Sequence, residues 1–427
     1  MPPLGWFGIV RLGLVQSAIG AIVMLVTSLL NRVMVVEYAL PAALPAGLVA
    51  WHYAVQLSRP AWGHGSDRGR RRTPWIVAGM AVLALGATLA VQAVGLFAVR
   101  SPWGYALALL AFTLIGAGVG AAGTSLLALL ATRVAPQRRA AAASITWIMM
   151  IAGIVVTAGV AGSLIDPFSL LRLAQVAGGV AGGAFLVALI AVWGVEGPRA
   201  ATPDAAPAMP FAAALRDMWA DDAARRFTVF VFLSMLAYSM QDLILEPFAG
   251  LLFGYTPGQS TQLSGLQHGG VLAGMILVGI GGSAFGGRSP SALRPWIVAG
   301  CIGSALALAG LALAARAGPG WPLGANIALL GFANGVFAVA AIGAMMGLAG
   351  AEPGREGIRM GIWGAAQAIA FGLGGLIGAI GVDAGRALTG SIPLTFTTVF
   401  AIEAALFLAA ATLALRAPIR AAALAPA

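Results

Sequence analysis

The stretch LAYSMQDLILEPFAGLLFGYTP, residues 236–257, combines a membrane-spanning pattern with charges inside it. It begins as an apolar helix and then places Gln241, Asp242 and Glu246 among Leu, Ile, Met and Phe. Asp242 and Glu246 are four residues apart, so a helix brings both carboxylates to one face. Because a carboxylate in hydrocarbon is costly, such residues normally face a bundle interior and mark a functional site. Pro247 follows directly, which predicts a kink or break at the carboxylates.

The composition of the whole chain is that of a membrane protein. Its 427 residues are 60% hydrophobic and 9% charged, whereas a soluble domain carries about 25% charged residues. All 24 basic residues are Arg, spread over short loops between apolar runs. The net charge of +10 therefore forms no single basic face, and we expect no nucleic-acid partner. The absence of Lys excludes a P-loop and a Schiff base, and the single Cys301 excludes a disulfide or zinc framework.

Runs of about 20 apolar residues, the length that crosses a bilayer, predict twelve spans. They lie near residues 12–36, 40–58, 74–98, 103–131, 141–165, 170–195, 227–252, 262–286, 293–315, 322–349, 358–383 and 392–415. The widest polar interruption, 196–226, separates six spans from six, as in two six-helix halves.

This spacing predicts three parts of the chain. Residues 1–196 form an N-terminal half, residues 197–226 a cytoplasmic linker, and residues 227–427 a C-terminal half. Within the linker, Phe211, Leu215, Met218 and Trp219 recur at helical spacing, which predicts a short amphipathic helix on the membrane surface. A partner-binding helix would show the same pattern.

The arginines predict the orientation of the spans. The N-terminus, the loops after even-numbered spans and the C-terminus hold 19 of the 24, and the opposite loops hold four. Since cytoplasmic loops carry the excess of positive residues, we expect both termini to be cytoplasmic.

The first span contains NRVMVVEYALP, residues 31–41, which parallels QDLILEP, residues 241–247, in the seventh. Both stretches carry an amide, a charge, four or five apolar residues, a Glu and a nearby Pro. Corresponding interrupted helices in two halves are the best sequence indication of a central site. We therefore expect a substrate-binding or coupling site formed by Asn31, Arg32, Glu37, Gln241, Asp242 and Glu246. Asp242 or Glu246 is the expected partner of Arg32, and a purely structural ion pair explains the pattern equally well.

Two histidines lie within predicted spans. His52 is inside the second, and His268 opens the eighth. A neutral imidazole can ligate the magnesium of a chlorin, so we include His268 in the candidate site. A histidine hydrogen-bonded between helices is the alternative for both. The sequence has no nucleophile elbow, HExxH or Walker motif, so we expect neither an enzyme nor a protein-bound metal.

The loop after the second span reads RPAWGHGSDRGRRRTP, residues 59–74. It resembles the loop motif of the major facilitator superfamily through Gly63, Asp67, Arg71 and Arg72. The resemblance implies that Asp67 accepts hydrogen bonds at the cytoplasmic face and holds one conformation closed. An ordinary arginine-rich cytoplasmic loop is the alternative.

Four stretches together resemble a more specific family. LNRVMVVEYALP, RPAWGHGSD, QDLILEPFAG and FGYTPGQSTQLSGLQHGG look like the PucC-type, or bacteriochlorophyll delivery, branch of the major facilitator superfamily. The last two are the most specific, because ordinary drug or sugar transporters do not carry them. The resemblance implies an all-α integral membrane protein of twelve transmembrane helices in two six-helix halves, the major facilitator fold, with spans one and seven lining a central cavity.

The resemblance also implies a function, namely a membrane assembly factor that delivers or inserts bacteriochlorophyll into light-harvesting complexes. The implied location is the bacterial inner, intracytoplasmic photosynthetic membrane. The implied partners are light-harvesting polypeptides, bacteriochlorophyll or its synthesis enzymes, and membrane lipid. We expect no tightly bound cofactor, with bacteriochlorophyll as cargo. Two hypotheses remain beside it: a proton-coupled transporter of a hydrophobic small molecule, with Asp242 and Glu246 as proton carriers, and a scaffold for antenna polypeptides.

Overall fold

The computed structural model describes residues 4–59, 62, 71–135, 138–196, 216, 219–220, 222–284, 290–349 and 356–416. Every regular element in these ranges is a helix. The elements are α1 (Trp6–Met24), η1 (Leu25–Leu29), α2 (Leu30–Arg32), η2 (Val33–Glu37), α3 (Ala43–Gln56), α5 (Thr73–Ala98), α6 (Trp103–Arg133), α7 (Arg139–Leu164), α8 (Leu170–Val192), α10 (Asp222–Met240), η4 (Gln241–Leu243), α11 (Leu245–Phe253), α12 (Pro257–Ala284), α13 (Pro290–Ala317), η5 (Gly318–Gly320), α14 (Leu323–Ala349), α15 (Glu356–Thr389) and α16 (Ile392–Arg416).

The described residues contain eleven helical segments long and apolar enough to cross a membrane. The chain is therefore a multi-pass membrane protein. The remaining predicted span, 40–58, corresponds to α3, which has 14 residues. At 1.5 Å per residue α3 is about 21 Å long, shorter than the ~30 Å hydrocarbon core. It begins late because Ala39 takes a positive φ of 50°, which ends the preceding helix.

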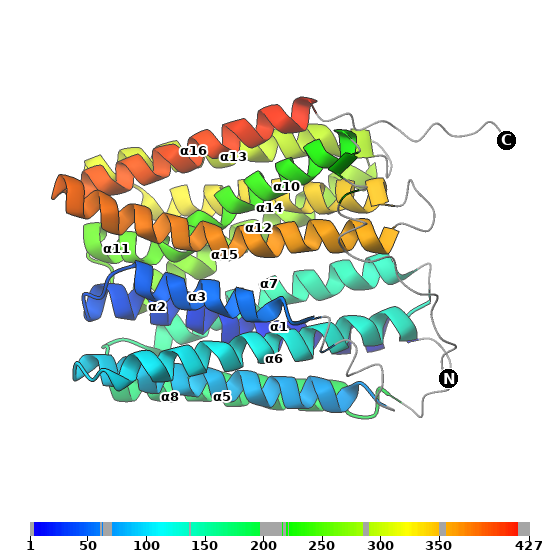
Figure 1. Cartoon of the computed structure of the whole chain (residues 1–427), viewed down its shortest axis with the longest axis horizontal. Coiled ribbons are helices and arrows are strands. Elements are labelled where there is room, and N and C mark those ends of the chain that lie inside the picture. Colours follow the sequence, from blue (N-terminus) through cyan, green and yellow to red (C-terminus); the bar gives the residue numbers. More distant parts are fainter. Residues whose placement is uncertain are drawn as a thin grey trace. The chain divides into compact units, whose positions relative to one another are not determined.

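The chain divides into two compact units, and each combines segments that are distant in sequence. The first unit contains residues 1–201 and 242–268, and the second contains residues 202–241 and 269–427. In the first unit α5 packs on α6 and α8, and α1 packs on α7 and α8 (Figure 1). In the second unit α13 packs on α14 and α16, and α10 packs on α15 and α16. The predicted halves and their linker stay a prediction, and most of 197–226 falls outside the described residues.

The two charged spans are interrupted where their polar residues lie. In the seventh span α10 ends at Met240, a 3₁₀ turn covers Gln241–Leu243, and α11 begins at Leu245, so the predicted break is confirmed. In the first span two π-helical segments, η1 and η2, flank the single turn that carries Asn31 and Arg32. Single-turn π segments inside α-helices are frequently found at functional sites.

Glycines bring several of these helices into backbone contact. A Cβ at Gly374 would lie 2.6 Å from Leu236 O, and one at Gly378 would lie 2.6 Å from Met240 O. The small-residue spacing of Gly374 and Gly378 thus serves close packing, as expected from membrane helices. Gly178 and Gly182 in α8 have the same spacing, but a Cβ added at Gly178 would meet nothing within 4 Å among the described residues.

Candidate functional site

The polar face of the first span meets the broken seventh span inside the first unit. Ser28 Oγ donates to Glu246 Oε1 and lies 3.1 Å from Ser264 Oγ of α12. One turn further along, Asn31 Nδ2 donates to the main-chain carbonyl of Leu243 at 2.7 Å. Leu243 belongs to the 3₁₀ turn at this break. Asn31 therefore stabilises the break that the sequence predicts.

Glu246 is the most deeply enclosed carboxylate of this group. Its residue is 3% exposed, and Oε1 is bound by Ser28. Its other oxygen, Oε2, is buried without a hydrogen-bond partner among the described residues. A buried polar atom without a partner calls for a bound water, a proton or a ligand, which makes Glu246 a candidate for proton or ligand binding.

Arg32 forms its ion pair with Glu37, five residues further along the same span. The salt-bridge partner of Arg32 is therefore Glu37 and not the expected Asp242 or Glu246, although Glu246 lies within electrostatic range of Arg32. The Arg32 residue is 2% exposed, whereas the Glu37 side chain is 31% exposed. The second guanidinium nitrogen, Nη2, donates to the carbonyl of Tyr255 at 2.6 Å. An α-helix brings residues three and four apart together, whereas the π-helical turn of η2 allows a contact five apart.

Glycine and tyrosine neighbours complete the surroundings of this ion pair. A Cβ at Gly250 would lie 3.2 Å from Arg32 Nη2 and 3.1 Å from Val36 Cγ2, so Gly250 leaves room for the guanidinium. Partial burial and the adjacent Glu37 carboxylate raise the pKa of Tyr38.

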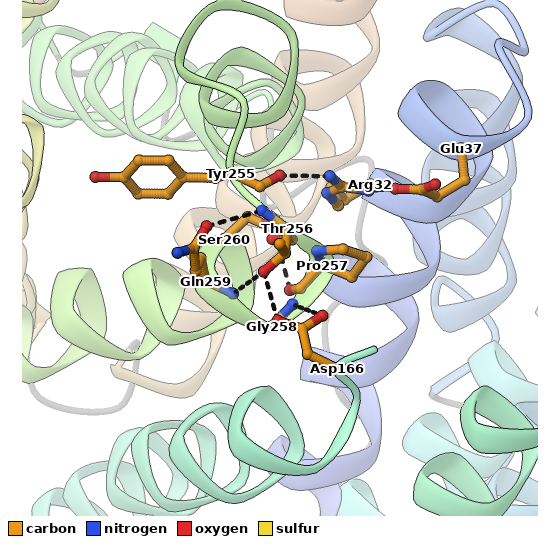
Figure 2. A network of polar contacts seen from close by, with 9 residues as sticks. All are labelled: Arg32, Glu37, Asp166, Tyr255, Thr256, Pro257, Gly258, Gln259 and Ser260. Atoms are coloured by element: carbon orange, nitrogen blue, oxygen red, sulfur yellow. Dashed lines mark hydrogen bonds and ion pairs between the residues drawn. The ribbon is translucent and has the colours of Figure 1, made fainter. Parts of the chain in front are cut away.

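A second carboxylate, Asp166, binds the start of α12. Thr256 Oγ1 donates to Asp166 Oδ2, and the Gly258 amide donates to Oδ1 at 3.2 Å. Thr256 and Gln259 also cap the helix reciprocally: Thr256 N donates to Gln259 Oε1 at 3.0 Å, and Gln259 N donates to Thr256 Oγ1 at 3.1 Å. Figure 2 shows this network beside Arg32, which lies between the Tyr255 carbonyl and Glu37.

Asp166 was not predicted from the sequence, although the helix start that it binds could be predicted. The letters TPGQ, residues 256–259, have the T-x-x-Q pattern of a capping box with Pro at the first helical position. That pattern predicts where α12 begins. It does not predict that an acid about 90 residues earlier in the chain binds the same threonine.

Arg32, Glu37 and Asp166 line one open cavity of about 550 Å³. Its remaining wall is formed by Pro167, Phe168, Gly250, Gly254, Tyr255, Thr256 and Pro257. All of these residues belong to the first unit. Ligand sites commonly have a few hundred cubic ångströms, mostly apolar walls and a small number of polar groups, and this cavity has each property.

The other predicted site residues are not part of the cavity lining. Gln241 is buried, and its amide atoms have no hydrogen-bond partner among the described residues. Asp242 interacts with the side chain of Gln267. His268 Nδ1 lies 2.9 Å from Ser264 O one turn earlier in α12, and His52 Nδ1 lies 2.6 Å from Val49 O. Both histidines thus bond to their own helix, and the described residues contain no group of three or more His, Cys, Asp or Glu placed to hold a metal.

The predicted loop motif is only partly within the described residues. Gly63 and Asp67 lie outside them, and Arg71 is exposed. Arg72 is buried and donates through Nη1 to Thr132 Oγ1 at 2.9 Å. Glu196, which sequence reasoning did not single out, accepts the main-chain amides of Arg72 and Thr73 at 2.6 to 2.8 Å.

The position of Glu196 has a simple electrostatic meaning. Its carboxylate lies at the N-terminus of α5, where unsatisfied amides and the helix dipole favour a negative charge. The end of the sixth predicted span is thereby fixed to the start of the third. A Glu directly after a long apolar run was the available signal, but its partner is 123 residues away in sequence.

We expect Gly258→Ala to destabilise the protein, because a Cβ there would lie 2.3 Å from Asp166 Oδ2 and 2.5 Å from Gly162 O. Overpacking of this kind costs about 1–3 kcal/mol. Thermal unfolding of the purified protein in detergent should show a lower midpoint. Gly269→Ala in the same helix is the control, since its Cβ would meet nothing within 4 Å in the part of the chain that the structure describes. Equal midpoints for the two variants would contradict the contact with Asp166.

Comparison with known proteins places this arrangement in a family. The family model described as PUCC protein matches residues 29–422. The chain belongs to the PUCC protein family. The matched range contains the broken seventh span, the capping box and the Arg32–Glu37 pair of this PUCC protein, and the predicted PucC resemblance is confirmed.

Two relatives from Rhodobacter capsulatus share most of the length of this PUCC protein. The chain is 53% identical over 416 residues to "Bacteriochlorophyll synthase 44.5 kDa chain", covering 96% of this chain and 95% of the relative. It is 31% identical over 425 residues to "Protein PucC", covering 94% of this chain and 90% of the relative.

A solved transporter structure shows the fold of this PUCC protein. The bacterial homologue of the lysosomal transporter Spinster, in an inward-facing and occupied conformation, matches with a TM-score of 0.71. The two chains are 15% identical, and the match covers 96% of each. The predicted all-α major facilitator fold is thereby confirmed.

Proposed function

We propose that this PUCC protein delivers bacteriochlorophyll to light-harvesting polypeptides during their assembly in the photosynthetic membrane. The observation that carries the proposal is the family match over residues 29–422, together with a 53% identical relative whose name refers to bacteriochlorophyll. We propose light-harvesting polypeptides, pigment-synthesis enzymes and lipid as its partners. We propose further that it handles pigment as cargo, without a tightly bound cofactor and without catalysing a reaction of its own.

The site geometry supports a carrier of a mostly apolar molecule. Pro167, Phe168 and Pro257 give the cavity apolar surface, and its charged groups are those of Arg32, Glu37 and Asp166. A chlorin is a flat apolar ring with a few carbonyl groups at its rim. Such a ligand needs large apolar contact and few polar groups for orientation, which is what this cavity offers.

Deleting the gene is expected to reduce antenna absorption several-fold while the cells keep their capacity to make bacteriochlorophyll. Membranes would be compared by near-infrared absorption, and total pigment by extraction into solvent. Complementation with the wild-type gene is the control, in a strain without related copies. Normal antenna absorption would reject the assembly role, and loss of pigment synthesis itself would indicate a biosynthetic role.

Proton-coupled transport is the second candidate, and Glu246 is the observation that favours it. Its carboxyl is buried, with Oε2 lacking a hydrogen-bond partner among the described residues, and buried acids in transporters often carry protons. Glu246→Gln keeps the size of the side chain and the acceptor for Ser28, but it cannot ionise. Antenna assembly by this variant at wild-type levels supports pigment delivery without proton coupling. Lost assembly at normal protein abundance supports the proton-coupled mechanism.

A further inference from the structure

The charges around the cavity are already matched by groups of the protein. Arg32 is paired with Glu37 and also donates to the Tyr255 carbonyl. Asp166 accepts from the Thr256 hydroxyl and the Gly258 amide. Among the described residues that line the cavity, Arg32 is the only cation, and Glu37 and Asp166 are the two carboxylates.

A further cation, Arg172, binds the backbone of two residues that line the cavity. Arg172 donates to the main-chain carbonyl of Asp166 at 2.5 Å and to that of Pro167 at 3.3 Å. Its guanidinium therefore lies on the backbone side of Asp166, and Arg172 is not part of the lining. A ligand in the cavity meets Glu37, Asp166 and an Arg32 that is already paired.

The charge of a ligand therefore has a large effect on how tightly it binds in this cavity. An incoming carboxylate has to displace Glu37 from Arg32 or remain beside two like charges with part of its water removed. Both alternatives are unfavourable, because like charges and lost hydration disfavour the ionised form. A neutral molecule encounters neither cost, and it gains contact with the apolar surfaces of Phe168, Pro167 and Pro257.

We infer that this cavity binds the neutral, esterified form of a carboxylate-bearing chlorin and rejects the free acid. The inference rests on the proposed function and names the chemical form of its cargo. A chlorin propionate is neutral when esterified and carries a negative charge when free. The cavity thereby separates finished, esterified pigment from its unesterified precursor by charge.

The test compares two ligands that differ in this charge alone. Purified protein in lipid nanodiscs would be titrated at neutral pH with bacteriochlorophyllide a and with its methyl ester, and binding followed by quenching of tryptophan fluorescence. Neither ligand has an isoprenoid tail, so tail partitioning into lipid does not contribute. We expect the methyl ester to bind at least about tenfold more tightly, which corresponds to ~1.4 kcal/mol. Empty nanodiscs correct for binding to lipid.

A charge variant tests whether this cavity is the part of the protein that distinguishes the ester from the free acid. Glu37→Gln keeps an acceptor beside Arg32 but removes the competing negative charge. We expect free-acid affinity to rise about tenfold relative to methyl-ester affinity. Asp383→Asn in α15 is the control, because it removes one carboxylate that is not part of the cavity lining, and it should leave both affinities unchanged.

Each outcome separates the inference from the proposed function. Tighter binding of the ester, reduced by Glu37→Gln, supports the inference. Equal affinities in the wild-type protein, or tighter binding of the acid, overturn it while leaving pigment delivery intact. If Glu37→Gln leaves the preference for the ester unchanged, another part of the protein makes the discrimination. That result overturns the assignment to this cavity. Binding of neither chlorin contradicts the proposed function itself.

Discussion

Replacing Glu37 by alanine is expected to destabilise the protein strongly, because it leaves the Arg32 guanidinium buried without its carboxylate. Breaking a buried ion pair in this way costs about 3–5 kcal/mol. The Glu37 side chain is 31% exposed, so water compensates part of the loss and we expect the lower end of that range. Glu37→Gln should cost less than Glu37→Ala, because its amide oxygen still accepts from Arg32.

The reverse substitution provides the matched comparison. Arg32→Met removes the buried charge itself and leaves Glu37 in contact with water, so it should destabilise less than Glu37→Ala. Combining Arg32→Met with Glu37→Ala should cost less than the sum of the single changes, whereas combining it with Asp242→Asn should be nearly additive. Thermal unfolding in lipid–detergent micelles ranks these variants. Coupling of Arg32 to Asp242 larger than its coupling to Glu37 would refute the observed pairing.

Gly335→Leu is expected to prevent most of the protein from folding. A Cβ at Gly335 in α14 would lie 2.1 Å from the carbonyl oxygen of Val271 in α12, and one at Gly274 in α12 would lie 2.2 Å from Phe332 O. The two helices therefore approach through their backbones at glycine positions, as small residues permit in membranes. A backbone carbonyl cannot rotate aside like a flexible side chain, so the helices themselves have to separate.

The yield of monodisperse protein after membrane extraction measures this effect. We expect a several-fold loss for Gly335→Leu, since a few kcal/mol already change the abundance of folded protein by that much. Gly279→Leu in α12 is the control, because its Cβ meets nothing within 4 Å among the described residues. Similar yields for the two leucine variants would show that the α12–α14 contact is looser than described.

The membrane class, the helical architecture and the break in the seventh span could all be predicted from the amino-acid sequence. These follow from local physics: long apolar runs require helices in lipid, and polar residues followed by Pro247 interrupt one of them. Thr256 and Gln259 likewise specify the start of α12 through a local capping pattern. The family could be recognised for a related reason, since its most specific motifs include these same local interruptions.

Which polar groups contact one another became known from the folded structure. The sequence suggested that Arg32 pairs with an acid of the seventh span, because opposite charges in apolar surroundings attract at any separation in sequence. The π-helical turn of η2 instead brings Glu37 within salt-bridge distance of Arg32. The residue pattern does not predict this departure from an α-helix. Asp166 meets Thr256 because α7 and α12 approach closely: a Cβ at Gly258 would touch Gly162 O. Contacts between distant segments depend on the packing of whole helices, so local patterns predict the helices and their interruptions but not these partners.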